Sequence, residues 1–154
     1  MAGLVCLLLV QEYKNEERSN KSMGVRVLIV DDDIDLRETV VRLLGRFGYS
    51  CLTASSGAEA TQAIEAESPD LVVTDLHMPG IDGVAVARCA RAHSPPIPVV
   101  LLTAYPMRVG HPQVQEAGAT IHLAKPFANR DLVHAVQRAL GGIESEGENA
   151  GSPR

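Results

Sequence analysis

Aromatic residues are scarce in this chain of 154 residues, which has no tryptophan, three tyrosines and two phenylalanines. Platforms that stack bases or sugar rings need such side chains, so the composition argues against a protein of that class. Hydrophobic residues make up 45% of the chain, as in an ordinary globular domain. One domain is expected, because domains commonly contain about 100–200 residues.

An excess of positive charge is also lacking, since 14 basic residues stand against 19 acidic ones and the net charge is −5. Proteins that coat nucleic acid normally present a basic face, so no direct nucleic-acid partner is expected. The apolar run Leu4–Val10 is far shorter than the roughly 20 residues that span a bilayer. No positive charge precedes it, as a secretory signal would require, and we expect no membrane partner.

Cysteines and histidines lack the spacings of metal or disulfide sites. The three cysteines, Cys6, Cys51 and Cys89, contain no C-x-x-C pair. Neither a disulfide framework nor a zinc ribbon is therefore supported, and a reducing cytoplasm is the expected compartment. The five histidines contain no H-E-x-x-H motif.

Short apolar runs alternate with amphipathic stretches along the middle of the chain. Strands are predicted at residues 25–30, 50–54, 71–74, 98–102 and 120–124. Helices are predicted at residues 35–47, 83–93, 107–117 and 129–140, and a further helix is predicted to begin after Ser56, which can cap it. Gly110 and Pro112 interrupt the fourth helix, which we expect to be weak. Five such units require right-handed crossovers, so the fold class is α/β, with a five-stranded parallel sheet covered by helices on both faces.

The predicted domain extends over residues 23–141. Residues 1–22 belong to no unit of the alternation and form an expected N-terminal extension, disordered or dispensable. Residues 142–154 are mostly Gly, Ser, Glu, Asn and Pro, which predicts a disordered polar tail. The fourteen residues after Leu140 are too few for a helix-turn-helix or catalytic module, so we expect a stand-alone domain that acts through another protein.

Polar residues stand at the ends of four predicted strands. These are Asp31-Asp32-Asp33, Asp75, Thr103 and Lys125. The carboxyl ends of parallel strands meet along one edge, where ligands bind in open α/β sheets. Crowded carboxylate oxygens suit Mg²⁺, a lysine and a threonine can bind phosphoryl oxygens, and a carboxylate can act as a nucleophile to give an acyl phosphate.

The residues around these positions resemble a known family. VLIVDDD at 27–33, PDLVVTDLHMPGIDG at 69–83, VVLLTA at 99–104 and AKPF at 124–127 are similar to the motifs of the response regulator receiver domain of two-component signalling. The resemblance covers about residues 24–140. It implies a flavodoxin-like doubly wound sheet of strand order 2-1-3-4-5, like that of single-domain chemotaxis regulators.

The resemblance also implies the chemistry of phosphoryl transfer. Asp75 would be the phosphoacceptor, attacking a phosphohistidine on a histidine kinase or phosphotransfer protein. Thr103 and Lys125 match the residues that contact phosphoryl oxygens, and Pro126 stands where the family has a cis proline. The chain would take part in its own Mg²⁺-dependent phosphorylation and dephosphorylation without being an enzyme on other substrates.

The implied cofactor is Mg²⁺. Asp31 and Asp32 match the acidic pair that positions the ion, with Asp32 and Asp75 as direct ligands and the backbone carbonyl of His77 as another. Gly80 and Gly83 would shape the turn that follows, where glycine conformational freedom is needed.

Two positions depart from the family pattern. His77 has a side chain that would point toward the phosphoryl group and tune its lifetime. His122 stands where family members carry Tyr or Phe as a switch residue working with Thr103. A downstream target protein would bind the face made by the fourth helix, the fifth strand and the fifth helix.

Two other functions remain open from the sequence. Haloacid-dehalogenase-like phosphatases use a D-x-D nucleophile motif, which Asp31 and Asp33 fit superficially, but they need a further acidic pair after the lysine. Asp131 is the only acid between Lys125 and the tail. A phosphorylation-independent binding module on the same fold is the third possibility, although such modules usually lose a catalytic residue.

Overall fold

The computed structural model describes residues 24–104, 112–118 and 121–141. The strands are β1 (Arg26–Val30), β2 (Ser50–Ala54), β3 (Leu71–Asp75), β4 (Val99–Thr103) and β5 (Ile121–Ala124). The helices are α2 (Ile34–Arg46), α3 (Gly57–Glu67), α4 (Gly83–Ala92), α5 (Pro112–Ala117) and α6 (Asn129–Leu140). The predicted extension and tail lie outside the described residues, so their boundaries remain predictions.

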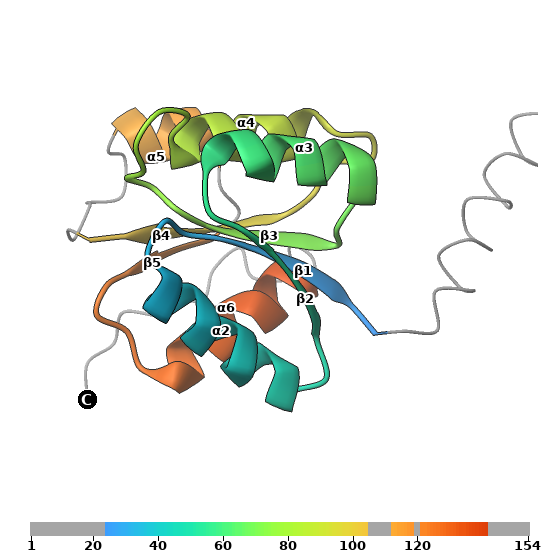
Figure 1. Ribbon diagram of the computed structural model, residues 1–154, viewed down its shortest axis with the longest axis vertical. Coiled ribbons are helices and arrows are strands. Elements are labelled where there is room, and N and C mark those ends of the chain that lie inside the picture. Colours follow the sequence, from blue (N-terminus) through green and yellow to red (C-terminus); the bar gives the residue numbers. More distant parts are fainter. Residues whose placement is uncertain (1–23, 105–111, 119–120, 142–154) are drawn as a thin grey trace, which may run out of the picture.

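The five strands form one parallel sheet in the order β2-β1-β3-β4-β5. Helices α3, α4 and α5 cover one face of this sheet, and α2 and α6 cover the other (Figure 1). The predicted fold class and strand order are both confirmed. The order reverses direction at β1 and β3, so the loops after these two strands diverge and leave a crevice between them.

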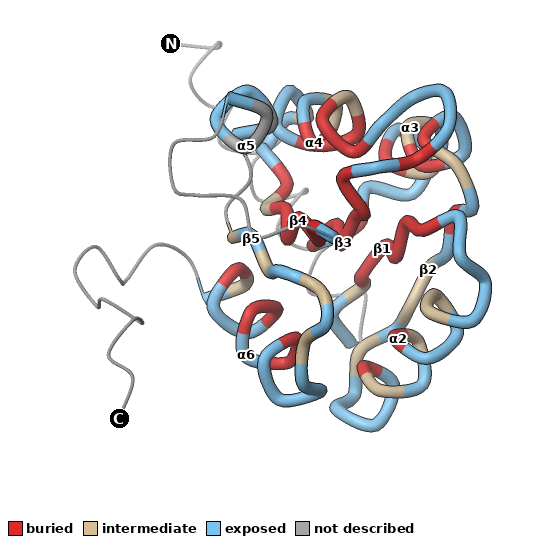
Figure 2. Tube along the Cα trace, turned by 90° about the vertical axis from the view of Figure 1, so that its left-hand side faces the viewer, coloured by how far each residue is buried: buried red, intermediate tan, exposed pale blue. Residues whose placement is uncertain are grey.

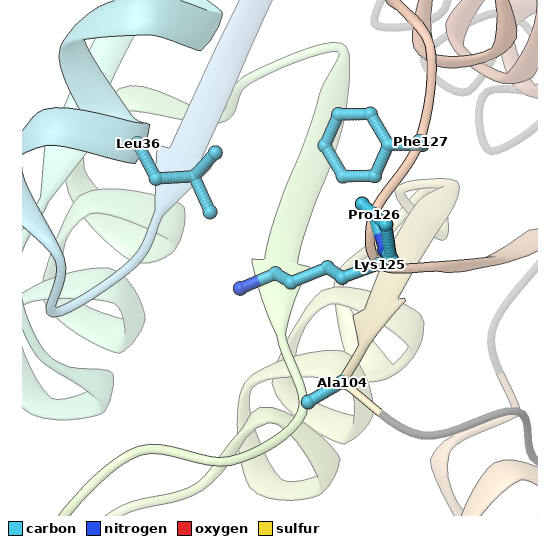
Figure 3. A pocket seen from close by; sticks show the side chains of 5 residues that line it. All are labelled: Leu36, Ala104, Lys125, Pro126 and Phe127. Carbon is cyan, nitrogen blue, oxygen red and sulfur yellow. The ribbon is translucent and has the colours of Figure 1, made fainter.

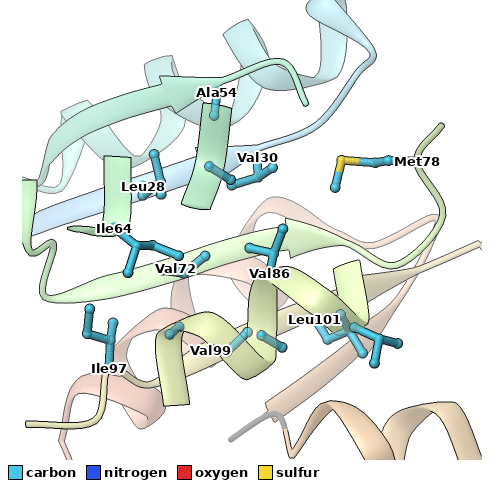
Figure 4. Close-up of a cluster of buried hydrophobic side chains, with 14 of the residues drawn as sticks. Leu28, Val30, Ala54, Ile64, Val72, Met78, Val86, Ile97, Val99 and Leu101 are labelled. Atoms are coloured by element: carbon cyan, nitrogen blue, oxygen red, sulfur yellow. The ribbon is translucent and has the colours of Figure 1, made fainter. Parts of the chain in front are cut away.

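The core consists of two apolar layers, one on each side of the sheet. β3 and β4 are buried along their whole length, and β1 along all but its first residue (Figure 2). One layer packs between the sheet and α3 and α4, and includes Leu28, Ile64 and Leu101 (Figure 4). The other packs α2 and α6 through Leu44 and Leu132. Central parallel strands are apolar on both faces for this reason, which explains their continuous runs of Val, Ile and Leu.

The described helices follow the predicted ones within one or two residues, apart from α5. Asp33 and Ser56 accept hydrogen bonds from the first amides of α2 and α3 and thereby cap them. Pro112 is the first residue of α5 in the described part of the chain, and the expected interruption of a longer helix stays a prediction. Proline is tolerated there, since the first helical amide has no partner within the helix. The earlier part of the predicted helix, residues 107–111, lies outside the described residues.

Among the helices in the described part of the chain, none combines the length and the apolar character that crossing a membrane requires.

Candidate functional site

The residues predicted from the strand ends lie together at the carboxyl edge of the sheet. Asp31 follows β1, Asp75 ends β3, Thr103 ends β4, and Lys125 follows β5. The strands bring them together through parallel pairing, in which Asp75 is level with Leu102, and Thr103 with Ala124. The amide of Lys125 donates to the carbonyl of Thr103 at 2.7 Å, which continues the β4–β5 pairing as far as the site.

Three carboxylates form a compact cluster in this crevice. Oxygens of Asp31, Asp32 and Asp75, one from each, lie within 4.8 Å of one another. Asp31 and Asp75 are buried, at 2% and 7% exposure, whereas Asp32 is exposed. Several hard oxygen donors that share one position and remain open to solvent on one side fit Mg²⁺, which keeps part of its water shell when bound.

The protein compensates only part of this negative charge. The ammonium nitrogen of Lys125 lies 3.3 Å from Oδ2 of Asp31 and 3.3 Å from Oδ2 of Asp75. The amide of Asp33 donates to the other oxygen of Asp31 at 2.9 Å. Burial nevertheless raises the pKa of Asp31, and the nearby charge of Asp75 adds to this, against the lowering effects of the Asp33 amide and Lys125. One lysine among three carboxylates thus leaves an excess of negative charge for a cation to neutralise.

The turn after β3 fixes the position of Asp75. The amide of His77 points at Oδ1 of Asp75 across 3.4 Å, and the side chain of His77 is exposed. Gly80 has a φ of +77°, which confirms the need for glycine freedom in this turn. At position 83 glycine is needed for a different reason, because a Cβ there would lie 2.1 Å from the carbonyl oxygen of Asp75. The start of α4 therefore packs directly on the backbone of the candidate nucleophile.

Thr103 and His122, the predicted switch pair, occupy contrasting environments. Thr103 is 1% exposed, and its hydroxyl has no hydrogen-bond partner among the described residues. A buried polar group without a partner is costly, and such groups mark places where a ligand or water completes the bonding. His122 is exposed on β5, level with the buried Leu101 of β4.

A hollow of about 410 Å³ opens beside Lys125. It is lined by Leu36 of α2, by Ala104 after β4, and by Lys125, Pro126 and Phe127 after β5 (Figure 3). The Lys125–Pro126 peptide bond is cis, as the resemblance implies. The lining of the hollow is largely apolar, and Lys125 connects it to the carboxylate cluster.

Sequence reasoning grouped Asp33 with the acidic cluster and missed Arg37 altogether. Asp33 is not part of the carboxylate cluster, since its Oδ1 accepts from the amides of Asp35 and Leu36 as the cap of α2. Arg37 donates to the carbonyl oxygen of Asp31 at 2.6 Å. The spacing of one helical turn past the cap was the available signal for Arg37, but nothing in the sequence distinguishes it from a solvated arginine.

Comparison with known proteins identifies the family. The family model of the response regulator receiver domain matches residues 27–137. The chain belongs to the response regulator receiver family. Its acidic cluster is therefore of the kind at which receiver domains generally bind Mg²⁺, and receiver domains interact with histidine kinases and downstream effectors.

Relatives of this receiver domain occur in longer proteins and as separate structures. The response regulator MprA of Mycobacterium sp. (strain KMS) is 40% identical over 131 residues, which cover 85% of this chain and 56% of that protein. The DNA-binding transcriptional regulator NtrC of Escherichia coli K12 is 32% identical over 120 residues, covering 78% and 26%. The chain thus spans about a quarter to a half of these curated relatives.

Solved structures show the same fold. The chemotaxis response regulator CheY4 of Vibrio cholerae superposes with a TM-score of 0.71 at 31% identity, covering 76% of this chain and 99% of that one. The receiver domain of the putative response regulator NarL from Mycobacterium tuberculosis gives a TM-score of 0.71 at 34% identity, covering 77% and 98%.

Proposed function

We propose that this receiver domain accepts a phosphoryl group on Asp75 from a phosphohistidine of a histidine kinase or phosphotransfer protein. The observation that carries the proposal is the placement of Asp75. Its carboxylate is buried beside two other carboxylates, 3.3 Å from the ammonium group of Lys125 and at the end of a central strand. We further propose that the chain is no multiple-turnover enzyme, and that it works in the cytoplasm.

In the transfer step, an oxygen of the Asp75 carboxylate attacks the phosphorus atom. The bond between phosphorus and the imidazole nitrogen of the donor breaks, and that nitrogen leaves with the electron pair. The product is an acyl phosphate on Asp75, and later attack of water on phosphorus returns the free carboxylate and inorganic phosphate. The hollow lined by Leu36 and Phe127 offers space for the donor's imidazole ring on the open side of the site.

Residues of the chain have distinct tasks in this step. Lys125 is placed to pair with a phosphoryl oxygen, and the unpartnered hydroxyl of Thr103 is free to donate to another. Asp31, Asp32 and Asp75, with the backbone carbonyl of His77, would hold Mg²⁺. When bound, Mg²⁺ would neutralise the charge that builds up on the phosphoryl oxygens.

The consequence for signalling would be a changed protein surface. A new dianion on Asp75 would draw Thr103 and Lys125 toward it, and both residues adjoin β4 and β5. We propose the face made by α5, β5 and α6 as the surface that a downstream target protein reads. Direct nucleic-acid binding is not part of the proposal, because the chain has an acidic balance.

The test is phosphorylation by acetyl phosphate in the presence of Mg²⁺. One phosphoryl group per chain is expected by mass spectrometry, removable by hydroxylamine as an acyl phosphate is. Asp75→Asn should abolish the label, since an amide is a poor nucleophile. Asp82→Asn is the matched control, because Asp82 caps α4 just beyond the site and asparagine caps equally well. Unchanged labelling of Asp75→Asn would overturn the proposal.

The same preparation separates the two other functions. Sustained turnover of a chromogenic phosphomonoester would indicate a phosphatase. The position of Asp33 argues against a phosphatase, because this second acid of the D-x-D motif caps helix α2. A phosphorylation-independent module would neither take the label nor bind beryllofluoride in the presence of Mg²⁺.

A further inference from the structure

Arg37 links the first turn of α2 to the loop that carries the acidic pair. Its backbone amide donates to the carbonyl of Asp33 within the helix, at 3.0 Å. Its guanidinium group turns back toward β1 and donates to the carbonyl oxygen of Asp31 at 2.6 Å. A bond from a charged donor to a backbone carbonyl is among the stronger hydrogen bonds in proteins.

The carbonyl that Arg37 contacts belongs to the peptide group joining Asp31 to Asp32. Asp31 is held at several other points, since its amide donates to Ala54 and its carboxylate bonds the Asp33 amide and Lys125. The Asp32 carboxylate, in contrast, has no hydrogen-bond partner among the described residues. Its position therefore depends on the orientation of the peptide before it, and Arg37 fixes that orientation.

The charge of Arg37 also acts on Glu59, a carboxylate outside the acidic cluster. The carboxylate of Glu59 in α3 accepts from the amide and hydroxyl of Ser55, and these two bonds, followed by the nearby charge of Arg37, lower the pKa of Glu59. A positive charge beside a cation site would by itself weaken cation binding. The attraction between Arg37 and Glu59 offsets a small part of this effect.

We propose that Arg37 is a positioning residue for Mg²⁺ binding, which acts by holding the Asp31–Asp32 peptide so that the Asp32 carboxylate faces Asp75. The proposal rests on the proposed function, because it assumes that the acidic cluster binds Mg²⁺. It extends that function to a residue on a neighbouring helix that does not itself touch the ion.

The test is calorimetric titration of Mg²⁺ into the wild-type chain and into Arg37→Met, which keeps an unbranched apolar stem but lacks the donor. Partners that orient metal ligands typically contribute at least a factor of ten to metal affinity, so the Kd for Mg²⁺ should rise about tenfold. The matched control is Arg42→Met on the same helix, because Arg42 pairs with the exposed Glu38 at the surface. This control should bind Mg²⁺ as the wild type does.

Two further variants separate positioning from a general effect on folding. Arg37→Lys keeps a charged donor and should recover part of the affinity. Arg37→Gln is too short to reach the Asp31 carbonyl and should match the methionine variant, so it substitutes for that variant if Arg37→Met does not fold. Metal-free melting temperatures should stay close to that of the wild type in all variants that bind weakly.

The outcomes are distinct. An unchanged Kd for Mg²⁺ in Arg37→Met or Arg37→Gln would overturn the proposal. If the metal-free melting temperature also fell strongly in that variant, Arg37 would be a structural residue only. Failure of the wild-type chain to bind Mg²⁺ would instead remove the proposed function, and this inference with it.

Discussion

The ammonium nitrogen of Lys125 lies 3.3 Å from a carboxylate oxygen of Asp75, and it is equally far from one of Asp31. One cation from the loop after β5 thus bridges two carboxylates from β1 and β3. The lysine side chain is 23% exposed, while those of the two aspartates are 3% and 10% exposed. The pair energies therefore fall between those of surface and buried ion pairs.

Lys125→Met should destabilise the metal-free domain by about 2 kcal/mol, a value between those for exposed and buried pairs. The reason is that two buried carboxylates lose the side-chain cation that pairs with both of them in the described part of the chain. Mg²⁺ should then raise the melting temperature of the variant by more than it raises that of the wild type, because the ion supplies the missing positive charge. Thermal unfolding with and without Mg²⁺ measures both effects. Equal Mg²⁺-induced shifts in the two proteins would contradict this account.

Thr103→Val should leave the unmodified domain as stable as the wild type, or up to about 1 kcal/mol more stable, since the buried hydroxyl has no partner among the described residues. The replacement has nearly the same shape. The stabilisation produced by beryllofluoride with Mg²⁺ should, however, be smaller in the variant, because the phosphoryl mimic loses a donor. Thr103→Ser, which keeps the hydroxyl, serves as the control, and a loss of stability in Thr103→Val before any ligand is added would show that the hydroxyl is already bonded.

Gly83→Ala should cost about 3 kcal/mol or more, because the new Cβ would lie 2.1 Å from the carbonyl oxygen of Asp75 and 2.7 Å from Cα of Leu76. Gly45→Ala is the contrasting change in α2, where a Cβ meets nothing within 4 Å. It should stabilise the domain by about 0.5–1 kcal/mol. Denaturant unfolding compares the two, and similar free energies of unfolding for both variants would refute the close contact at Gly83.

The sequence predicted the sheet and the gathering of Asp31, Asp75, Thr103 and Lys125 because both follow from periodicity and parallel topology. Apolar runs of five residues, each ending in a polar residue, are visible without coordinates, and parallel pairing brings their ends to one edge. The sequence could not tell whether a helix breaks or begins at Pro112, because proline does both, and only the position of the first turn decides between these roles.

The parts that could not be predicted depend on side-chain direction and close approach. Arg37 on a helix with exposed charges is indistinguishable in sequence from Arg42, although one bonds the Asp31 carbonyl and the other pairs with Glu38 at the surface. Gly83 was expected to supply conformational freedom, but its close approach to the backbone at the end of the preceding strand, β3, explains it. The direction of Arg37 and the close contact at Gly83 arise from tertiary packing between segments that are far apart in the pattern of the sequence.

Glu59 should make the stability of the domain depend on acid pH. The Ser55 amide and hydroxyl, together with Arg37, hold the pKa of Glu59 below its ordinary value of 4.5. An acid whose pKa is lower in the folded state contributes stability above the unfolded value, and this is lost as pH falls through the folded value. Glu59→Gln should thus lower the melting temperature at pH 7 but not at pH 3. Glu65→Gln, elsewhere on α3, is the control, and a pH-independent difference for Glu59→Gln would count against the Ser55 contacts.

The last prediction concerns how a phosphoryl group on Asp75 would reach the surface. β5 is one of the two edge strands of the described sheet, its residues Ile121 and Leu123 pack toward α6, and His122 lies exposed on the opposite side. If Thr103 moves toward the phosphoryl group, space opens beside β5 into which the His122 side chain can turn, which would alter the face made by α5, β5 and α6. His122→Ala should keep labelling at Asp75 but weaken the phosphorylation-dependent change in amide hydrogen exchange across residues 105–122. His134→Ala, an exposed histidine on α6, should leave that change intact. An undiminished exchange difference in His122→Ala would show that His122 does not take part in the switch.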